Sequence, residues 1–249
     1  MAKYKGWDTS RSLLIAYESM AMAYKKQHSI EEINADFAKR TPSKYVNYNH
    51  AFALLILNAS IIEGILRGII SDRVTSDIDQ AVIKGRSLGQ TSPSKPEQLL
   101  SKFLSDIEMQ GGWDKLKEQY SFYYDVSLEK LVSEEIKEGI SSLFVLRNVL
   151  AHGTTLIQPS VKMDESLQDT YPYNWQRKLQ RVAVYLEKQF SKGELFENLA
   201  EFEMPSHFFE VTKQYIEAVE KRFSPLPQRI EETIKMVKEY SFGYINYTR

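Results

Sequence analysis

The sequence contains no cysteine. Disulfide bonds, thiolate nucleophiles and cysteine-ligated metal centres are therefore excluded, and a chain that needs no disulfide is compatible with the cytoplasm, where we expect it. The chain has four histidines, and no two of them have the spacing of zinc ligands: His28, His50, His152 and His207. We therefore expect no metal site.

Other common signatures are also missing. The sequence has no glycine-rich phosphate loop, no G-x-S-x-G nucleophile motif, no internal repeat and no alternating segment of strand length. These absences argue against nucleotide cofactors and serine hydrolase chemistry, and we expect no cofactor. The first residues, M-A-K-Y-K-G-W-D, contain no apolar stretch of the kind found in secretory signals.

An excess of charge of one sign is missing as well. The chain has 32 Lys and Arg against 33 Asp and Glu, which gives a formal net charge of -1. Nothing in the overall charge attracts nucleic acid, so any RNA contact must come from local basic clusters, and we expect no DNA partner. At 43% hydrophobic and 26% charged residues, the composition is that of a globular protein.

What is present is helical periodicity. Apolar residues recur at spacings of three and four in most segments, which predicts an all-α fold and a single helical domain over residues 1–249. We expect one helix from Thr9 or Ser10, and a second short helix from Ser29, where S-I-E-E resembles a capping box. Later helices are expected around 99–110, 133–153, 174–190, 208–222 and 227–240.

The most apolar run covers residues 50–70. Its length of about 20 residues would suffice for a membrane span, but Asn58, Glu63 and Arg67 favour a buried central helix, so we expect no membrane partner. Small residues lie on one side of this helix and would let a neighbour approach closely: Ala53, Ser60, Gly64 and Gly68. Glu63 either pairs with Arg67 four residues later or faces Arg147 and orients it.

The segment from Ser71 to Lys95 is polar and ends in a stretch rich in Gly, Ser and Pro, so we interpret it as a long loop. Lys84, Arg86 and Lys95 give it local positive charge. The most basic helix surface is expected further on, at Arg177, Lys178 and Arg181. Such charges usually lie on solvated faces, but these three residues are the first candidates for RNA phosphate contacts.

One stretch stands out, L-F-V-L-R-N-V-L-A-H-G at residues 143–153. It has the pattern of the last turns of an amphipathic helix that ends at Gly153. At about 100° per residue, Arg147 falls in the middle of the apolar arc, where a charge is unfavourable unless it is paired or lies at an interface. Asn148 and His152 lie four residues apart at the flank of that arc. A structural ion pair and a simple helix cap would also explain these residues.

The ordered set Arg147, Asn148 and His152 resembles the R-x4-6-H signature of the HEPN superfamily, including the Asn that usually follows the Arg. The resemblance covers the segments near 50–70 and 133–153. It implies a HEPN-like helical bundle with additional N- and C-terminal helices, a core at 45–190 and a C-terminal helical extension at 191–249. It also implies a homodimer whose motif helices meet in one cleft, so that the apolar arc around Arg147 would be the dimer seam.

The resemblance further implies a metal-independent endoribonuclease, a toxin or phage-defence effector, with RNA as substrate and a cognate antitoxin as a further partner. His152 would act as general base or acid on the ribose 2′-hydroxyl, Arg147 would stabilise the phosphate, and Asn148 would hold His152 or the substrate, with Glu63 in support. Some family members carry a Tyr two residues after the His, where this chain has Thr154. The alternative is a non-catalytic HEPN-like protein that binds RNA, a nucleotide or a protein partner.

Overall fold

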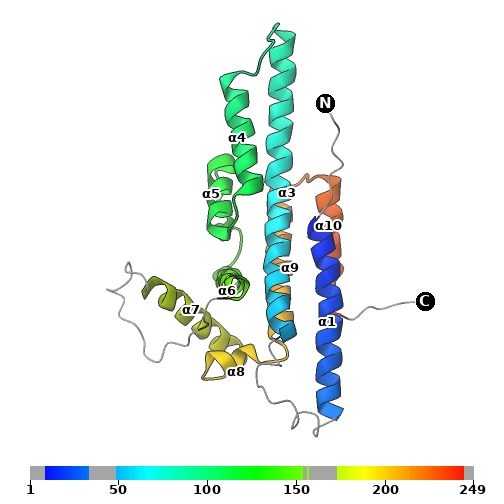
Figure 1. The fold of residues 1–249 in the computed structure, drawn as a ribbon, viewed down its shortest axis with the longest axis vertical. Helices are drawn as coiled ribbons and strands as arrows, with labels where there is room; N and C mark the ends of the chain where they lie inside the picture. The colour runs from blue at the N-terminus through cyan, green and yellow to red at the C-terminus, as the bar shows by residue number, and fades with distance from the viewer. Residues whose placement is uncertain (1–8, 34–48, 154–155, 157–172, 244–249) are drawn as a thin grey trace, which may run out of the picture.

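The computed structural model describes residues 9–33, 49–153, 156 and 173–243. Within these ranges every regular element is a helix, which confirms the all-α prediction (Figure 1). In chain order the elements are α1 (Thr9–Ile33), α3 (Asn49–Ser87), α4 (Lys95–Met109), α5 (Trp113–Tyr124), the 3-10 turn η2 (Leu128–Lys130), α6 (Glu134–His152), α7 (Tyr173–Phe190), α8 (Leu195–Leu199), α9 (Met204–Phe223) and α10 (Gln228–Glu239).

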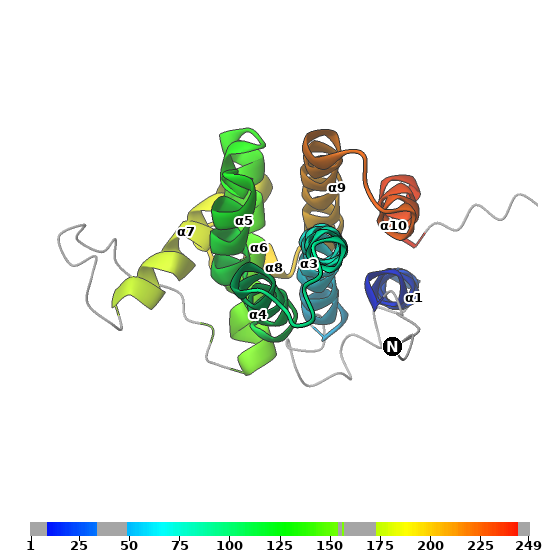
Figure 2. The ribbon, with the colours of Figure 1, turned by 90° about the horizontal axis from the view of Figure 1, so that it is seen from above.

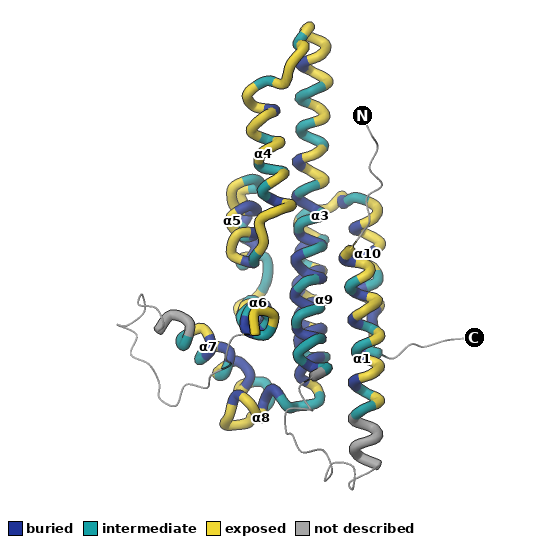
Figure 3. Tube along the Cα trace, viewed as in Figure 1, coloured by how far each residue is buried: buried dark blue, intermediate teal, exposed yellow. Residues whose placement is uncertain are grey.

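The helices form layers around α3. Figure 2 shows α1 and α10 on one side of α3 and α9, with α4, α5 and α6 on the other side and α7 beyond them. Helix α6 is seen end-on in Figure 1, so it crosses α3 instead of running alongside it. Burial is concentrated where these layers meet, as Figure 3 shows for the lower half of α3 and for α9.

Helix α3 is the axis of the fold because its middle is largely apolar and is buried on most sides. Ile61, Ile62, Ile65 and Leu66 are fully buried, and each contributes about 1.5–3 kcal/mol through the burial of its side chain. By length and composition α3 could cross a membrane, yet 56% of its most apolar window is buried inside the protein, as in a core helix. The described part of the chain therefore uses this apolar run to build its core.

The small-residue face of α3 does admit close neighbours. A Cβ atom at Gly64 would collide with the Ser10 side chain of α1, and one at Gly68 would lie 2.5 Å from Ile230 Cδ1 of α10. Larger side chains at these two positions would push α1 and α10 away from the core. The sequence-based prediction of close helix approach is confirmed here.

The prediction of a long loop at 71–95 was wrong. Helix α3 continues to Ser87, and only residues 88–94 connect it to α4. The reason is a narrow apolar stripe: Val74 is fully buried and Ile78 packs on the core, while the polar residues between them face outward. Helix α4 lies beside this part of α3, and the Ser71 hydroxyl bonds to Glu108 across the pair. Tertiary packing thus outweighs the polar composition.

The predicted helix start at Ser29 was also wrong, because α1 continues without a break to Ile33. Residues 34–48, which follow, lie outside the described residues. The C-terminal helices start near their expected positions, with α9 beginning four residues earlier at Met204. Helix α9 packs against both α3 and α6 and buries Phe208, Phe209 and Tyr215. The segment predicted as a C-terminal extension therefore supplies part of the core.

Candidate functional site

The predicted motif helix forms as expected. Helix α6 begins after Ser133 and ends at His152, and Gly153 follows in the left-handed conformation with a φ of 62°. A side chain at a positive φ is strained, so glycine suits this stop. Its buried side includes Ile140, Leu143 and Phe144. The helix end therefore presents the residues from Arg147 to His152 at the edge of the core.

Arg147 lies on the buried side of α6, and its charge is paired. Arg147 Nη2 lies 2.5 Å from Glu63 Oε2 of α3, and the two side chains are only 18% and 11% exposed. A carboxylate facing a guanidinium removes most of the penalty of keeping that charge out of water. The pair joins α6 to α3 across 84 positions of sequence.

Of the two partners expected for Glu63, the structure pairs it with Arg147 and not with Arg67. Arg67 turns to α4 instead, where its Nη1 donates to the backbone carbonyl of Ile107. The other oxygen of Glu63, Oε1, is buried and accepts no hydrogen bond from the part of the chain that the structure describes. Glu63 therefore holds Arg147 and keeps one acceptor atom unused.

Asn148 completes the support of Arg147. Arg147 Nη1 donates to Asn148 Oδ1 over 2.9 Å, so the guanidinium is held by two acceptors from two helices. The amide oxygen of Asn148 is therefore directed to Arg147, whereas the resemblance assigned Asn148 to His152 or to the substrate. Only the oxygen of the Asn148 amide can accept from Arg147, so this contact sets the orientation of the amide.

His152 lies apart from this network. It is the last residue of α6 and is exposed, and within the described ranges its ring makes no hydrogen bond to Arg147 or Asn148. Ala151 is also exposed, so the buried face of α6 ends at Val149 and the half-buried Leu150. The structure thus brings Glu63, Arg147 and Asn148 together and leaves His152 open to solvent on the next turn.

The basic residues of α7 are partly available. Lys178 and Arg181 are exposed and Arg177 is half-buried. At 100° per residue Arg177 and Arg181 share one stripe of α7, while Lys178 lies to its side. Helix α7 packs against α6. No hydrogen bond or ion pair in the described ranges connects these three residues to Arg147.

A polar pair between α7 and α9 had no signal in the sequence. The hydroxyl of Tyr185 lies 2.7 Å from His207 Nε2, next to the ring of Phe190. Burial lowers the pKa of His207, partly opposed by the charge of Glu135, and burial raises the pKa of Tyr185. The two residues are 22 positions apart on different helices, so no local pattern connects them.

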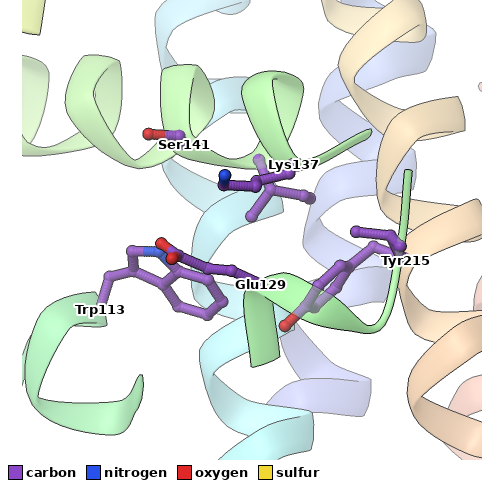
Figure 4. A pocket seen from close by; sticks show the side chains of 7 residues that line it. Trp113, Glu129, Lys137, Ser141 and Tyr215 are labelled. Atoms are coloured by element: carbon purple, nitrogen blue, oxygen red, sulfur yellow. The ribbon is translucent and has the colours of Figure 1, made fainter. Parts of the chain in front are cut away.

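Two hollows in the surface lie elsewhere. The smaller, of about 10 Å³, is at the lower limit for one water molecule, and Figure 4 shows Trp113, Glu129, Lys137 and Tyr215 gathered around it. The larger, of about 690 Å³, lies between α3, the end of α5 and the segment joining α9 to α10. Neither is lined by a predicted site residue, so the end of α6 is a surface site in this single chain.

Comparison with models of protein families, with curated proteins and with solved structures finds no match to this chain. The family resemblance therefore rests on the motif from Arg147 to His152 and on its helical setting.

Proposed function

We propose that this protein is a metal-independent endoribonuclease that acts as a homodimer, with the end of α6 as its catalytic surface. The observation that carries the proposal is the arrangement of the motif. Arg147 is fixed by Glu63 and Asn148 at the edge of the core, and the exposed His152 follows on the next turn of the same helix. Cleavage of a phosphodiester by the neighbouring 2′-hydroxyl requires a cation for the phosphate and an imidazole for the proton, and this helix end carries both.

The roles follow from the chemistry of each group. The exposed imidazole of His152 can take the proton of the 2′-hydroxyl as a general base. The oxygen then attacks the adjacent phosphorus, the bond to the 5′-oxygen breaks, and the 5′-oxygen takes a proton from an imidazolium or from water. The products are a 2′,3′-cyclic phosphate and a 5′-hydroxyl. Arg147 stabilises the charge on the phosphate, and Glu63 and Asn148 act as positioning residues for its guanidinium.

A second copy of the chain would enclose this open surface. Leu150 is half-buried beside Arg147, and Phe52 and Ile56 are half-buried on the stripe of α3 that also carries Glu63. Two-fold pairing of this face would cover the apolar side chains and bring two copies of Arg147 and His152 together. Arg177, Lys178 and Arg181 on α7 would then contact RNA phosphates beside the cleft. A toxin or phage-defence role, with an antitoxin as partner, fits such an activity.

The test is incubation of the purified protein with total RNA in EDTA, followed by analysis of the product ends. Cleavage that yields 2′,3′-cyclic phosphates and 5′-hydroxyls supports the proposal. Intact RNA at every protein concentration, or products with 3′-hydroxyl ends, would refute it. Mass measurement in solution on the same sample checks the dimer.

A second candidate is a non-catalytic helical protein that binds RNA, a nucleotide or a protein partner through the same face. The favouring observation is that Arg147 already has two protein acceptors, so its pairing with Glu63 alone accounts for its place on α6. Under this alternative His152 is only a helix terminus. RNA or nucleotide binding without cleavage, unchanged by replacement of His152, would identify it.

A further inference from the structure

The end of α3 and the start of α4 form a helical hairpin, whose tip we define as residues 80–99. Its tip projects beyond the other helices, as Figure 1 shows, and Figure 3 shows it largely exposed. Three large aliphatic residues in the tip are mostly exposed to solvent, Ile83 at 69%, Leu88 at 78% and Leu99 at 68% of full exposure. Exposed aliphatic side chains around one projecting tip are typical of an interaction surface.

The tip is ordered by an internal polar network. Ser94 and Glu97 form a capping box at the start of α4, and Gln90 donates to both Glu97 and the Ser92 carbonyl. Glu97 is only 4% exposed. Gln90, Ser94 and Glu97 thus bond to one another and hold the turn, while Leu88 remains exposed.

The exposed charge of residues 80–96 is of one sign, and the nearest exposed carboxylate on α3 is that of Asp79, one turn before Ile83. Residues 80–96 contain Lys84, Arg86 and Lys95, all exposed, and no acidic residue. The nearest carboxylate on α4, that of Glu97, is buried and bonded within the turn. The chain as a whole has a net charge of -1, so this positive end is a local feature. Its complement is a negatively charged partner.

We propose that this tip docks on an anionic lipid surface, with Ile83, Leu88 and Leu99 entering the boundary between headgroups and acyl chains. A convex tip with aliphatic side chains and flanking cations matches such a boundary in both shape and charge. The contact is peripheral, so it revises the expectation of no membrane partner without making α3 a membrane span.

Two other occupants fit less well. RNA is bound through phosphates and through stacking on aromatic rings, and residues 80–96 contain no aromatic residue; the first on α4 is Phe103, which packs against Phe122 of α5. A second copy placed tip to tip would bring Lys84, Arg86 and Lys95 against the same cations of its partner, which is unfavourable.

The experiment is co-sedimentation of the full chain with vesicles of phosphatidylcholine alone or with phosphatidylserine added to about 30%, at about 0.1 M salt. We expect binding only to the anionic vesicles. Lys84→Gln with Arg86→Gln should weaken it by about fivefold for each charge removed, and Ile83→Ser with Leu88→Ser should abolish sedimentation. The matched controls are Lys115→Gln with Lys235→Gln, and Ile15→Ser with Met22→Ser, which change exposed residues outside the tip.

Binding to anionic vesicles that is lost in both tip variants and kept in both controls supports the proposal. No binding to anionic vesicles overturns it, and so does binding that the tip variants leave unchanged. Loss of RNA binding in the tip variants, without vesicle binding by the parent, would assign the tip to RNA instead. RNA cleavage by the tip variants is measured in parallel. The vesicle result therefore tests the lipid proposal independently of the endoribonuclease proposal.

Discussion

Arg147 Nη2 on α6 lies 2.5 Å from Glu63 Oε2 on α3, and this contact joins the two helices whose sequences carry the family resemblance. It has a structural consequence whatever the protein does. A half-buried or buried cation needs its counter-charge, so the stability of the fold and the geometry of the motif depend on the same pair.

Removal of one partner should destabilise the protein. We expect Glu63→Gln or Arg147→Ala to lower the free energy of unfolding by about 3 kcal/mol, because each leaves a charge or its acceptor without a partner at low exposure. The double variant Glu63→Leu with Arg147→Leu should lose much less. Urea denaturation of the double variant and of its two single variants, Glu63→Leu and Arg147→Leu, provides the double-mutant cycle, and additive losses would show that the two side chains do not interact.

The close approach of α6 to α7 and α9 predicts an effect at Gly139. A Cβ there would lie 2.7 Å from the Tyr185 hydroxyl and 2.8 Å from Val211 Cγ1. Gly139→Ala should destabilise by about 1–2 kcal/mol, since overpacking outweighs the gain of about 1 kcal/mol in helix propensity. Gly193→Ala, with nothing within 4 Å, is the control. A thermal scan in which Gly139→Ala is as stable as the parent would contradict the packing.

The half-buried His207 predicts a dependence of stability on pH. Burial lowers the pKa of His207 below its value in the unfolded chain, so the unfolded state binds the extra proton first as the pH falls. Stability should therefore decrease on acidification from about pH 6.5. The urea midpoints of the parent and His207→Gln, measured at pH 7.5 and pH 5.5, report this loss. An equal loss in both proteins would mean that His207 is not its source.

Much of the fold was predictable from local patterns, and the failures have a common cause. The apolar period of α6, its stop at Gly153 and the small-residue face of α3 all follow from rules that act within one helix. The extension of α3 from Ser71 to Ser87 was missed because it depends on burial of Val74 and Ile78 against neighbouring helices. The continuation of α1 past Ser29 was missed because the S-x-x-E sequence pattern of a capping box also occurs inside helices.

The candidate site shows the same division. Helical periodicity predicted Arg147, Asn148 and His152 on one helix and gave Glu63 as one of two alternatives for pairing. The structure has the contact between Glu63 and Arg147. The sequence had no means of placing the Asn148 amide on Arg147, or of pairing Tyr185 with His207, because both depend on side-chain orientation within the folded core.

The central claim is that Arg147 and His152 perform RNA cleavage. The most direct measurement is the rate of cleavage of a fluorescent RNA oligonucleotide in EDTA by the parent, Arg147→Ala, His152→Ala and the surface control Arg229→Ala. We expect a loss of at least about 100-fold for His152→Ala and Arg147→Ala, with unchanged circular dichroism for His152→Ala and an unchanged rate for Arg229→Ala. A His152→Ala protein that cuts as fast as the parent would contradict the account.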